Sequence, residues 1–335
     1  MAIIEGSYIK GLMRGFAPKA LPVLKGGGMP LYSELQLCDI GLNLSDPMFR
    51  GVYNSRQCHP DDLELVLARA LSMGVSRSIF TGTTIEDSIE SLQLVRKLEP
   101  QYGLYSTAGI PPTRCSVFQD EDSATQVISQ LSEVLEEGMN GKNVVAIGEC
   151  GLDYDRLQFC DKDTQKKGFI HQLQLTSRFE LPFFFHNRNT NGDFLDIVRY
   201  HQHLLVKGGV VHSFDGSLEE AEAFMKLGLF IGVNGCSLKS EESLRVVKAI
   251  PLEFLLLETD SPWCSIKPSH ASEKFMNTVF STKKKDKYES GFLVKDRGEP
   301  CMLVQVLEVV AALKSISPAE LAEITYRNSV RLFFS

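Results

Sequence analysis

The chain has 335 residues, 43% of them hydrophobic and 23% charged, a composition typical of a globular protein with a sizeable core. Its formal net charge of −7 argues against broad electrostatic binding to nucleic acid, so a phosphate-bearing substrate would need metal ions or a local Lys/Arg cluster. No apolar run approaches the roughly 18 residues of a membrane span, so we expect no membrane contact, and nothing in the sequence indicates an obligate protein partner.

Residues 1–36 differ from the rest of the chain. Up to Lys25, the basic residues Lys10, Arg14, Lys19 and Lys25 outnumber the single acid, Glu5. The run Gly26–Gly28 would break any helix. We expect a loosely ordered leader, with one domain over 37–335. An organelle-targeting segment is the alternative, because the segment is poor in acids, although its serine content is low.

From Leu37 onward, short apolar runs alternate with longer amphipathic segments. The runs predict strands over 37–44, 75–81, 104–110, 144–149, 181–186, 209–212, 229–233 and 254–260. The amphipathic segments predict helices over 60–73, 86–98, 124–137, 163–179, 192–200, 218–227, 241–250, 300–314 and 318–334. Strands that alternate with helices pair in parallel, and eight such units close into a (β/α)₈ TIM barrel. The active site of such a barrel lies at the C-terminal ends of its strands.

The eight cysteines are scattered and form no C-x-x-C pair; they stand at positions 38, 58, 115, 150, 160, 236, 264 and 301. This usage is typical of reduced thiols in an intracellular protein rather than of a disulfide framework or a zinc ribbon. We therefore expect a cytoplasmic and/or nuclear location.

The strongest predicted strand ends in a carboxylate. Val144–Gly148 reads as a buried strand, and Glu149 follows it directly. A carboxylate at the end of a buried strand has lost most of its water, which is costly unless a cation or a hydrogen-bond donor compensates. Glu149 could therefore bind a cation, or it could cap the next helix or pair with an arginine.

Three further strand ends favour the cation. The predicted strands also end in His186, His212 and Asp260, so that, with Glu149, two histidines and two carboxylates share one rim of the barrel. Nitrogen and oxygen ligands in this combination suit a divalent metal. No P-loop, Rossmann fingerprint, G-x-S-x-G or H-E-x-x-H motif competes, which leaves metal-assisted hydrolysis as the reaction class.

Two neighbours of these residues have supporting roles. Glu258 lies two positions before Asp260, so both side chains should point into the barrel, where Glu258 would orient a ligand or pair with an arginine. Arg188 lies two positions past His186 and would contact a phosphate or pair with an acid.

Residues beyond the last strand could contact a polymer. Trp263, the only tryptophan, either packs over the rim or stacks on a nucleobase, an interaction worth about 1–3 kcal/mol. The densest basic cluster is Lys283, Lys284 and Lys285, followed by Lys287. It is either a solvated loop or the place where this acidic protein meets phosphates.

Five segments together resemble the TatD-related metal-dependent deoxyribonucleases, in particular the eukaryotic branch of that family. They are VVAIGECGLDYDRLQFC, FFFHNRN, VVHSFDG, IGVNGCSLK and LLETDSPWC, and the resemblance runs over about 39–334. It implies a TIM barrel of the metal-dependent hydrolase type and divalent-metal-dependent hydrolysis of DNA phosphodiesters, commonly as a 3′→5′ exonuclease.

The resemblance also implies roles for the four rim residues. Glu149 would be shared by two metal ions, His186 and His212 would be ligands, and Asp260 would be a ligand that also positions the attacking water. One or two ions per chain are expected. Oxygen ligands and phosphoryl chemistry favour Mg²⁺ or Mn²⁺, while this ligand set also accepts Zn²⁺.

Three motifs depart from the family pattern. Gly41-Leu-Asn43 replaces an H-x-H pair that many relatives carry on the first strand. Pro111 stands where the family motif G-x-H-P has its histidine, and proline cannot bind metal or donate to a phosphate. Arg297–Pro300 reads R-G-E-P where relatives read R-N-E-P. These departures leave two alternatives to a DNase: a hydrolase of a small cyclic amide or ester, and a DNA-binding protein with weakened catalysis.

Overall fold

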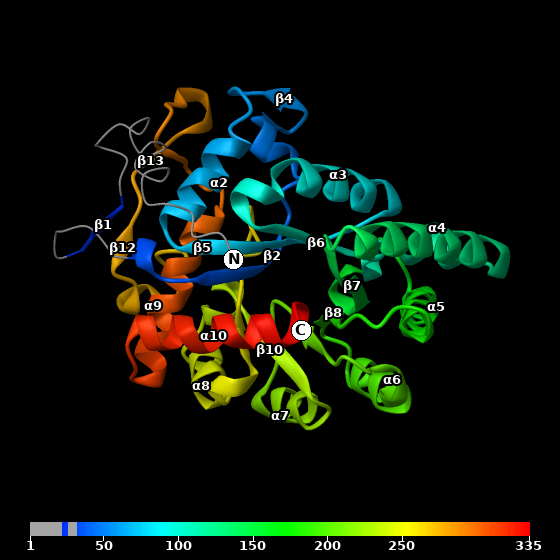
Figure 1. Ribbon diagram of the computed structural model, residues 1–335. Coiled ribbons are helices and arrows are strands. Elements are labelled where there is room, and N and C mark those ends of the chain that lie inside the picture. The colour runs from blue at the N-terminus through cyan, green and yellow to red at the C-terminus, as the bar shows by residue number, and fades with distance from the viewer. Residues whose placement is uncertain (1–21, 26–31) are drawn as a thin grey trace.

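The computed structural model describes residues 22–25 and 32–335, and its centre is a barrel of eight parallel strands (Figure 1). In spatial order they are β2 (Leu37–Leu42), β5 (Val75–Phe80), β6 (Leu104–Ala108), β7 (Val144–Asp153), β8 (Phe183–Arg188), β9 (Gly209–Val211), β10 (Leu229–Val233) and β11 (Leu255–Leu257). A bridge between Leu42 and Ser261 joins the last strand to the first. The predicted TIM barrel is confirmed.

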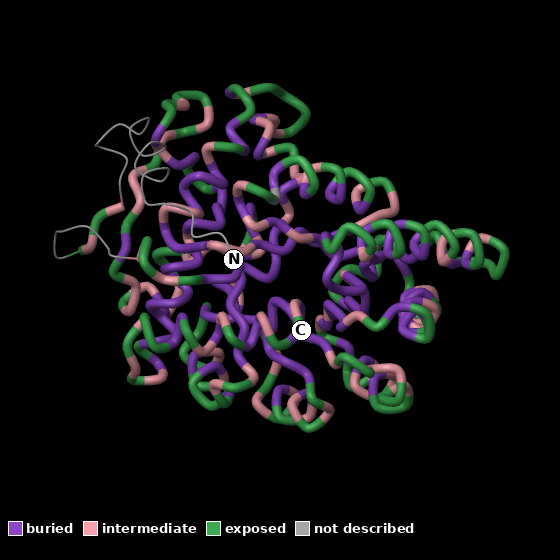
Figure 2. Tube along the Cα trace, in the orientation of Figure 1, coloured by how far each residue is buried: buried purple, intermediate pink, exposed green. Residues whose placement is uncertain are grey.

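Helices surround the strands (Figure 1). They are α2 (Leu63–Ser72), α3 (Ile85–Tyr102), α4 (Glu121–Asn140), α5 (Lys162–Leu173), α6 (Asp193–Tyr200), α7 (Leu218–Lys226), α8 (Glu241–Ala249), α9 (Leu303–Lys314) and α10 (Pro318–Phe333). Figure 2 shows buried residues gathered at the centre and exposed residues on the outer faces of the helices. No single helix of the described chain is long and apolar enough to span a membrane; only α9 and α10 taken together, bent by 107°, pass a test of length and composition.

Several predicted boundaries were wrong, among them the end of β11, which lies at Leu257 rather than at Asp260, and the three that follow. The strand predicted over 144–149 continues to Asp153, because it stays paired with β8 as far as Arg188. The helix predicted over 163–179 ends at Leu173 and passes into a 3₁₀ turn, Gln174–Ser177. The helix predicted over 300–314 begins at Leu303, after the 3₁₀ turn Pro300–Met302.

Alternation along the strands separates two apolar layers. In β8, Phe184 points into the barrel, whereas Phe185 packs on Phe169 of α5 and Phe194 of α6, with ring centroids 5.7 and 5.5 Å away. The inner cluster comprises Cys38, Ile40, Ile79, Val145, Ala146, Phe184, Val210, Phe230, Leu256, Leu332 and Phe333. Its last two members come from the end of α10, so this helix closes one end of the barrel and the site lies at the other.

A buried carboxylate supports the seam between β2 and β11. Asp39 is fully buried and accepts hydrogen bonds from the backbone N–H of Thr259 at 2.9 Å and from its hydroxyl at 2.6 Å. The backbone N–H of Asp260 also donates to Gly41 across the seam, at 2.9 Å. Side chains therefore add to the few backbone bonds that close the barrel.

Buried charges fix the loops near the C-terminal ends of these strands. Arg297 donates to both carboxylate oxygens of Asp62 at 2.7 Å and to Glu299 at 2.8 Å. Arg69 of α2 donates to the same Glu299 at 2.8 Å. The carboxylates and Arg297 have no exposed side-chain surface. This cluster ties the loop before α9 to the start of α2.

Two short pieces of the expected leader contact the barrel domain. Strand β1 (Val23–Leu24) pairs with β12 (Thr278–Val279), and Lys25 forms an ion pair with Glu273 at 2.6 Å. Tyr32 donates a hydrogen bond to Glu308 at 2.6 Å. Leader residues 1–21 and 26–31, which include Lys10, Arg14, Lys19 and Gly26–Gly28, lie outside the described residues, so the leader and the targeting alternative stay predictions.

Candidate active site

The backbone of β7 presents Glu149 through a close approach to β8. Gly148 has a φ of 141°, and a Cβ atom built on it would lie 2.2 Å from the carbonyl oxygen of Phe184. Only glycine fits this conformation and this contact. The pairing of β7 with β8 shifts by one residue between Gly148 and Cys150. Glu149 is the additional residue of this bulge, so it has no pairing partner on β8.

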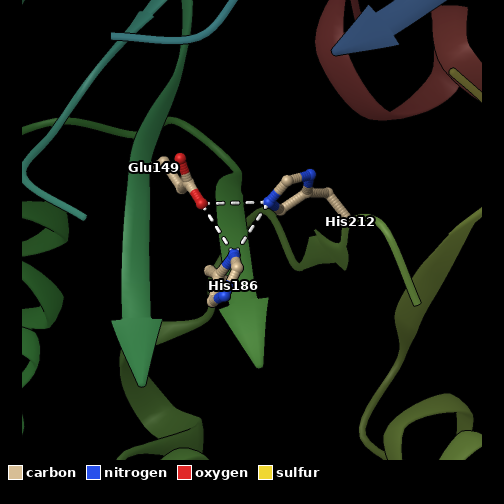
Figure 3. A group of neighbouring side chains, drawn as sticks. All are labelled: Glu149, His186 and His212. Carbon is tan, nitrogen blue, oxygen red and sulfur yellow. Dashed lines mark hydrogen bonds and ion pairs between the residues drawn. The ribbon is translucent and has the colours of Figure 1, made fainter. Parts of the chain in front are cut away.

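Three side chains from three adjacent strands converge at the barrel mouth (Figure 3). Oε1 of Glu149 lies 2.8 Å from Nδ1 of His186 and 3.0 Å from Nε2 of His212. The two ring nitrogens lie 3.2 Å from each other. Within the described chain, this is the one group of acids, histidines or cysteines whose donor atoms are close enough to hold a metal ion.

Each histidine also faces a second carboxylate with its other nitrogen. Nε2 of His186 lies 3.2 Å from Oδ2 of Asp153, and Nδ1 of His212 lies 3.5 Å from Oε2 of Glu258. Glu258 is fully buried and accepts a hydrogen bond from the backbone N–H of Ser213. Histidines that bind metal usually have such a carboxylate partner, which orients the ring. Glu258 therefore lies behind His212, inside the barrel as expected.

The pKa shifts of Glu149, His186 and His212 show that this site stabilises positive charge. Burial alone would raise the pKa of Glu149, but the charges of His212 and His186 outweigh it and hold the pKa below its ordinary value. Burial alone would lower the pKa of His212, yet Glu149 and Glu258 raise it well above its usual range. The pKa of His186 is also raised, against burial, by its hydrogen bonds to Asp153 and Glu149. A divalent cation meets the same preference for positive charge.

Asp260 lies on the same rim but outside this trio. Its Oδ1 accepts a hydrogen bond from Asn43 at 2.9 Å, and its Oδ2 accepts one from the Cys264 thiol at 3.2 Å. Burial raises the pKa of Asp260 to about 6. The structure thus brings together three of the four expected ligands and holds the fourth by other partners. Asn43 belongs to the segment that replaces the H-x-H pair of many relatives.

A cleft of about 240 Å³ opens beside Glu149, His186 and Asp153. Its other lining residues are Thr83, Pro111, Pro112, Thr113 and Arg114. Pro111 thus lies at the site, where the resemblance placed a histidine. Arg114 is exposed, and no ion pair joins it to any residue that the structure describes. The sequence had indicated no role for Arg114 or Asp153. The one feature of the sequence that could have pointed to Arg114 is that this basic residue follows Pro111 by three positions.

Arg188 is engaged by the protein itself. It forms an ion pair with Asp215 and donates a hydrogen bond to the carbonyl oxygen of Ser213 at 3.2 Å. Of the two roles expected for Arg188, the structure therefore shows the ion pair with an acid. Arg188 would have to leave Asp215 before it could contact a phosphate.

Trp263 stands out from the rim rather than packing over it. The residue is 54% exposed, and its backbone N–H closes a turn onto Asp260 at 2.9 Å. Gly298 packs against this turn, since a Cβ there would lie 2.8 Å from the Trp263 carbonyl oxygen. An asparagine at 298 would therefore collide with the loop that carries Trp263, so Gly298 serves this packing here.

The lysine cluster lines a different cleft, of about 310 Å³. Lys284 and Lys285 lie there beside Tyr53, and the ammonium of Lys285 is 4.7 Å from the centre of that ring. Lys283 is paired with Glu289 at 2.9 Å. The cluster is thus partly neutralised, and its cleft shares no lining residue with the cleft beside Glu149.

Comparison with known proteins gives a consistent result over nearly the whole chain. The family model "TatD related DNase" matches residues 40–334. A Schizosaccharomyces pombe protein named deoxyribonuclease Tat-D is 43% identical and covers 89% of this chain and 96% of its own length. An Erwinia tasmaniensis protein named 3′-5′ ssDNA/RNA exonuclease TatD is 34% identical, with 88% and 98% covered. The crystal structure of a TatD family hydrolase from Entamoeba histolytica superposes with a TM-score of 0.83 at 35% identity, covering 90% of this chain and 98% of that one.

Proposed function

Because this chain belongs to the family of TatD-related DNases, we propose that it is a divalent-metal-dependent deoxyribonuclease that digests DNA from the 3′ end. Membership makes it a hydrolase of phosphodiester bonds. The names of bacterial relatives, 3′-5′ ssDNA/RNA exonuclease, support the direction of digestion.

The observation that carries the metal dependence is the convergence of Glu149, His186 and His212. One carboxylate oxygen and two imidazole nitrogens lie within 4.8 Å of one another, and each imidazole has a second carboxylate behind it. This donor set fits a divalent cation. Phosphoryl transfer favours Mg²⁺ or Mn²⁺, with Zn²⁺ as the third candidate, and we propose one or two ions per chain.

Each residue of the site has a separate task in this proposal. Glu149, His186 and His212 would hold the cation, and Glu258 would keep His212 in position. A divalent cation supplies Lewis acidity, which polarises a phosphoryl oxygen and makes water more acidic. Asp260, oriented by Asn43 and Cys264, would be a further ligand and accept a proton from the attacking water.

Substrate binding would use positive charge and one aromatic ring. Arg114 would bind a phosphate, because it is the arginine that lines the cleft with Glu149 and His186. Trp263 would stack on a base. Lys283, Lys284 and Lys285 would meet phosphates farther along the strand, and Arg188 would join them only by leaving Asp215. DNA would be the partner.

The compartment that we propose is supported by the cysteines. All eight thiols are free, which suits an intracellular location, cytoplasmic and/or nuclear. Two curated relatives that match nearly the whole domain are named for nuclease activity, which favours DNA over a small cyclic amide or ester as the substrate.

Cleavage assays with end-labelled DNA test the proposed function. Purified protein should shorten 5′-labelled single-stranded DNA stepwise with Mg²⁺ or Mn²⁺, and EDTA should stop the reaction. Glu149→Gln should lower both the rate and the affinity for Mn²⁺, measured by calorimetry, by more than about 100-fold, because the shared carboxylate is lost. Glu180→Gln, an exposed acid away from the site, is the matched control.

Two outcomes would contradict the proposal. Cleavage that is equal in wild type, Glu149→Gln and EDTA-treated protein would exclude this site as its source. Binding of metal and DNA without any product would instead favour the weakened DNA-binding relative, with Pro111 in place of the family histidine.

A further inference from the structure

Two cysteines from different loops meet beside the candidate active site. Cys236 lies in the 3₁₀ turn Gly235–Leu238 after β10, and Cys264 lies in the loop after β11. Their Sγ atoms are 2.7 Å apart, although 28 residues separate them in sequence. A disulfide bond has an S–S length of about 2.05 Å, so a small movement would join them.

The backbones of these two loops are also in direct contact. A Cβ atom built on Gly235 would lie 2.1 Å from the carbonyl oxygen of Cys264. The glycine therefore lets the turn that carries Cys236 press against the loop that carries Cys264. The thiol contact thus belongs to a packed interface between two loops.

The other six cysteines offer no such pair. Five of them are buried; they are Cys38, Cys115, Cys150, Cys160 and Cys301. Cys58 is half-buried like Cys236 and Cys264, but its thiol faces the carbonyl oxygen of Arg56, at 3.6 Å. Only the Cys236–Cys264 pair combines access from solvent with a thiol partner.

We propose that Cys236 and Cys264 form a site of reversible oxidative modification by hydrogen peroxide. The Cys236 sulfur attacks one peroxide oxygen: an S–O bond forms, the O–O bond breaks, and the leaving oxygen departs as water after taking a proton. The Cys264 sulfur then attacks Cys236, so that the S–S bond forms, the S–O bond breaks and a second water leaves. Two thiols and one H₂O₂ become one disulfide and two waters, and a dithiol reductant reverses the change.

Charge favours Cys236 as the attacking sulfur. The adjacent Cys264 thiol and the nearby ammonium of Lys239 lower the pKa of Cys236 to about 6. A thiolate is the nucleophilic form of cysteine. The short distance between the two sulfur atoms identifies the site. The lowered pKa of Cys236 indicates only that this sulfur attacks the peroxide first and that Cys264 attacks second.

Oxidation would reach the active site through one hydrogen bond. The thiol of Cys264 donates to Oδ2 of Asp260 at 3.2 Å, and a disulfide has no proton to donate. Asp260 would keep only Asn43 as a side-chain donor. This consequence rests on the proposed function, in which Asp260 accepts a proton; the modification itself does not.

Peptide mapping of the full-length protein tests the site. Protein treated with a small molar excess of H₂O₂ is alkylated, digested with trypsin without reduction and analysed by mass spectrometry. We expect a disulfide between peptides 227–239 and 249–274, which contain only Cys236 and Cys264, and its loss after dithiothreitol. Cys236→Ser should abolish this product, whereas Cys58→Ser should leave it unchanged. Oxidation of Cys58 in wild type without the 236–264 product would overturn the proposed site.

Cleavage of labelled DNA by the same samples tests the link to Asp260. The oxidised protein should lose about tenfold in rate, the scale of one hydrogen bond to a charged group, and dithiothreitol should restore it. Peroxide should leave the rate of Cys236→Ser unchanged. If the disulfide forms but the rate of cleavage does not change, the link to Asp260 is wrong. If the protein never cleaves DNA, the proposed function is wrong, and peptide mapping alone then decides whether the disulfide forms.

Discussion

The cleft beside Glu149 owes its permanent positive charge to a single side chain. Arg114 lines it with two prolines and two threonines, and the acids Glu149 and Asp153 line the same cleft. On a protein with a net charge of −7, an anionic substrate needs such a group close to the reacting phosphate. Arg114 stands three residues from Pro111, so a guanidinium could supply a phosphate contact that proline cannot make.

Replacing Arg114 should therefore weaken substrate binding more than turnover. We expect Arg114→Gln to raise KM for single-stranded DNA about 10-fold or more and to reduce the slope of log KM against log salt by about one phosphate contact. Arg114→Lys should recover part of the loss. Arg245→Gln, an exposed arginine of α8, is the matched control. Equal KM and equal salt slopes for Arg114→Gln and Arg245→Gln would exclude the phosphate contact.

At this scale the sequence predicted the site residues that directly follow apolar runs. Glu149, His186 and His212 follow apolar runs without interruption, so the barrel alone brings them together. The position of Asp153 at the site could not be predicted, because β7 continues past the bulge at Glu149 and the apolar pattern does not indicate this. Arg114 escaped because a loop has no periodicity that would reveal which way it faces.

Among the elements, the loop before α9 and the start of α2 are joined by buried ions rather than by apolar packing. Arg297 contacts Asp62 and Glu299, all without exposed side-chain surface. A buried pair adds little net stability over an apolar replacement of both partners, but removal of one partner leaves charge uncompensated. Arg297 thus holds two carboxylates that would otherwise repel each other.

Arg297→Met should consequently lower the free energy of unfolding by about 3–5 kcal/mol, measured by urea denaturation. Arg327→Met removes an exposed arginine that lies 3.9 Å from Glu323 on α10, and it should cost less than about 1 kcal/mol. If both variants unfold at the same urea concentration as wild type, the buried cluster has no role in stability.

Element types were predictable from sequence, while several ends were not. Alternating apolar and amphipathic runs identified every barrel strand and the helices around it. The end of α5 was missed because apolar residues continue into the 3₁₀ turn Gln174–Ser177, which hydrophobic spacing does not distinguish from a helix.

The molecule as a whole depends on how the first strand meets the last. Asp39 on β2 binds Thr259 just after β11, and burial raises the pKa of Asp39 well above its ordinary value. The folded protein therefore keeps a proton that the unfolded chain releases from about pH 4 upward. Stability from this group is complete below that pH and falls as pH rises towards the folded pKa.

Asp39→Asn should flatten this pH dependence. The amide has no proton to lose, so the free energy of unfolding between pH 4 and pH 7 should fall less steeply than in wild type, by at most about 1.4 kcal/mol per pH unit. Urea denaturation at several pH values measures the slope. Asp286→Asn, which removes an exposed carboxylate, is the control. If the free energy of unfolding changes with pH equally steeply in Asp39→Asn, Asp286→Asn and wild type, Asp39 is not protonated in the folded protein.

The barrel itself could be predicted because eight repeats of strand and helix leave few other topologies. The seam could not be predicted, since Asp39 and Thr259 are 220 residues apart and neither belongs to a local pattern. The same holds for the Cys236–Cys264 contact, which depends on how two loops pack.

His186 is part of the ladder between β7 and β8, and the bulge residue Glu149 lies between paired residues of β7, because the two strands stay paired beyond them to Asp153 and Arg188. Ligands on loops lose conformational entropy when an ion arrives, whereas here that entropy was lost when the chain folded. A cation would therefore meet a preorganised cage of nearly fixed radius. Discrimination between ions would then depend on how well each ion fits that radius, with little adjustment by the protein.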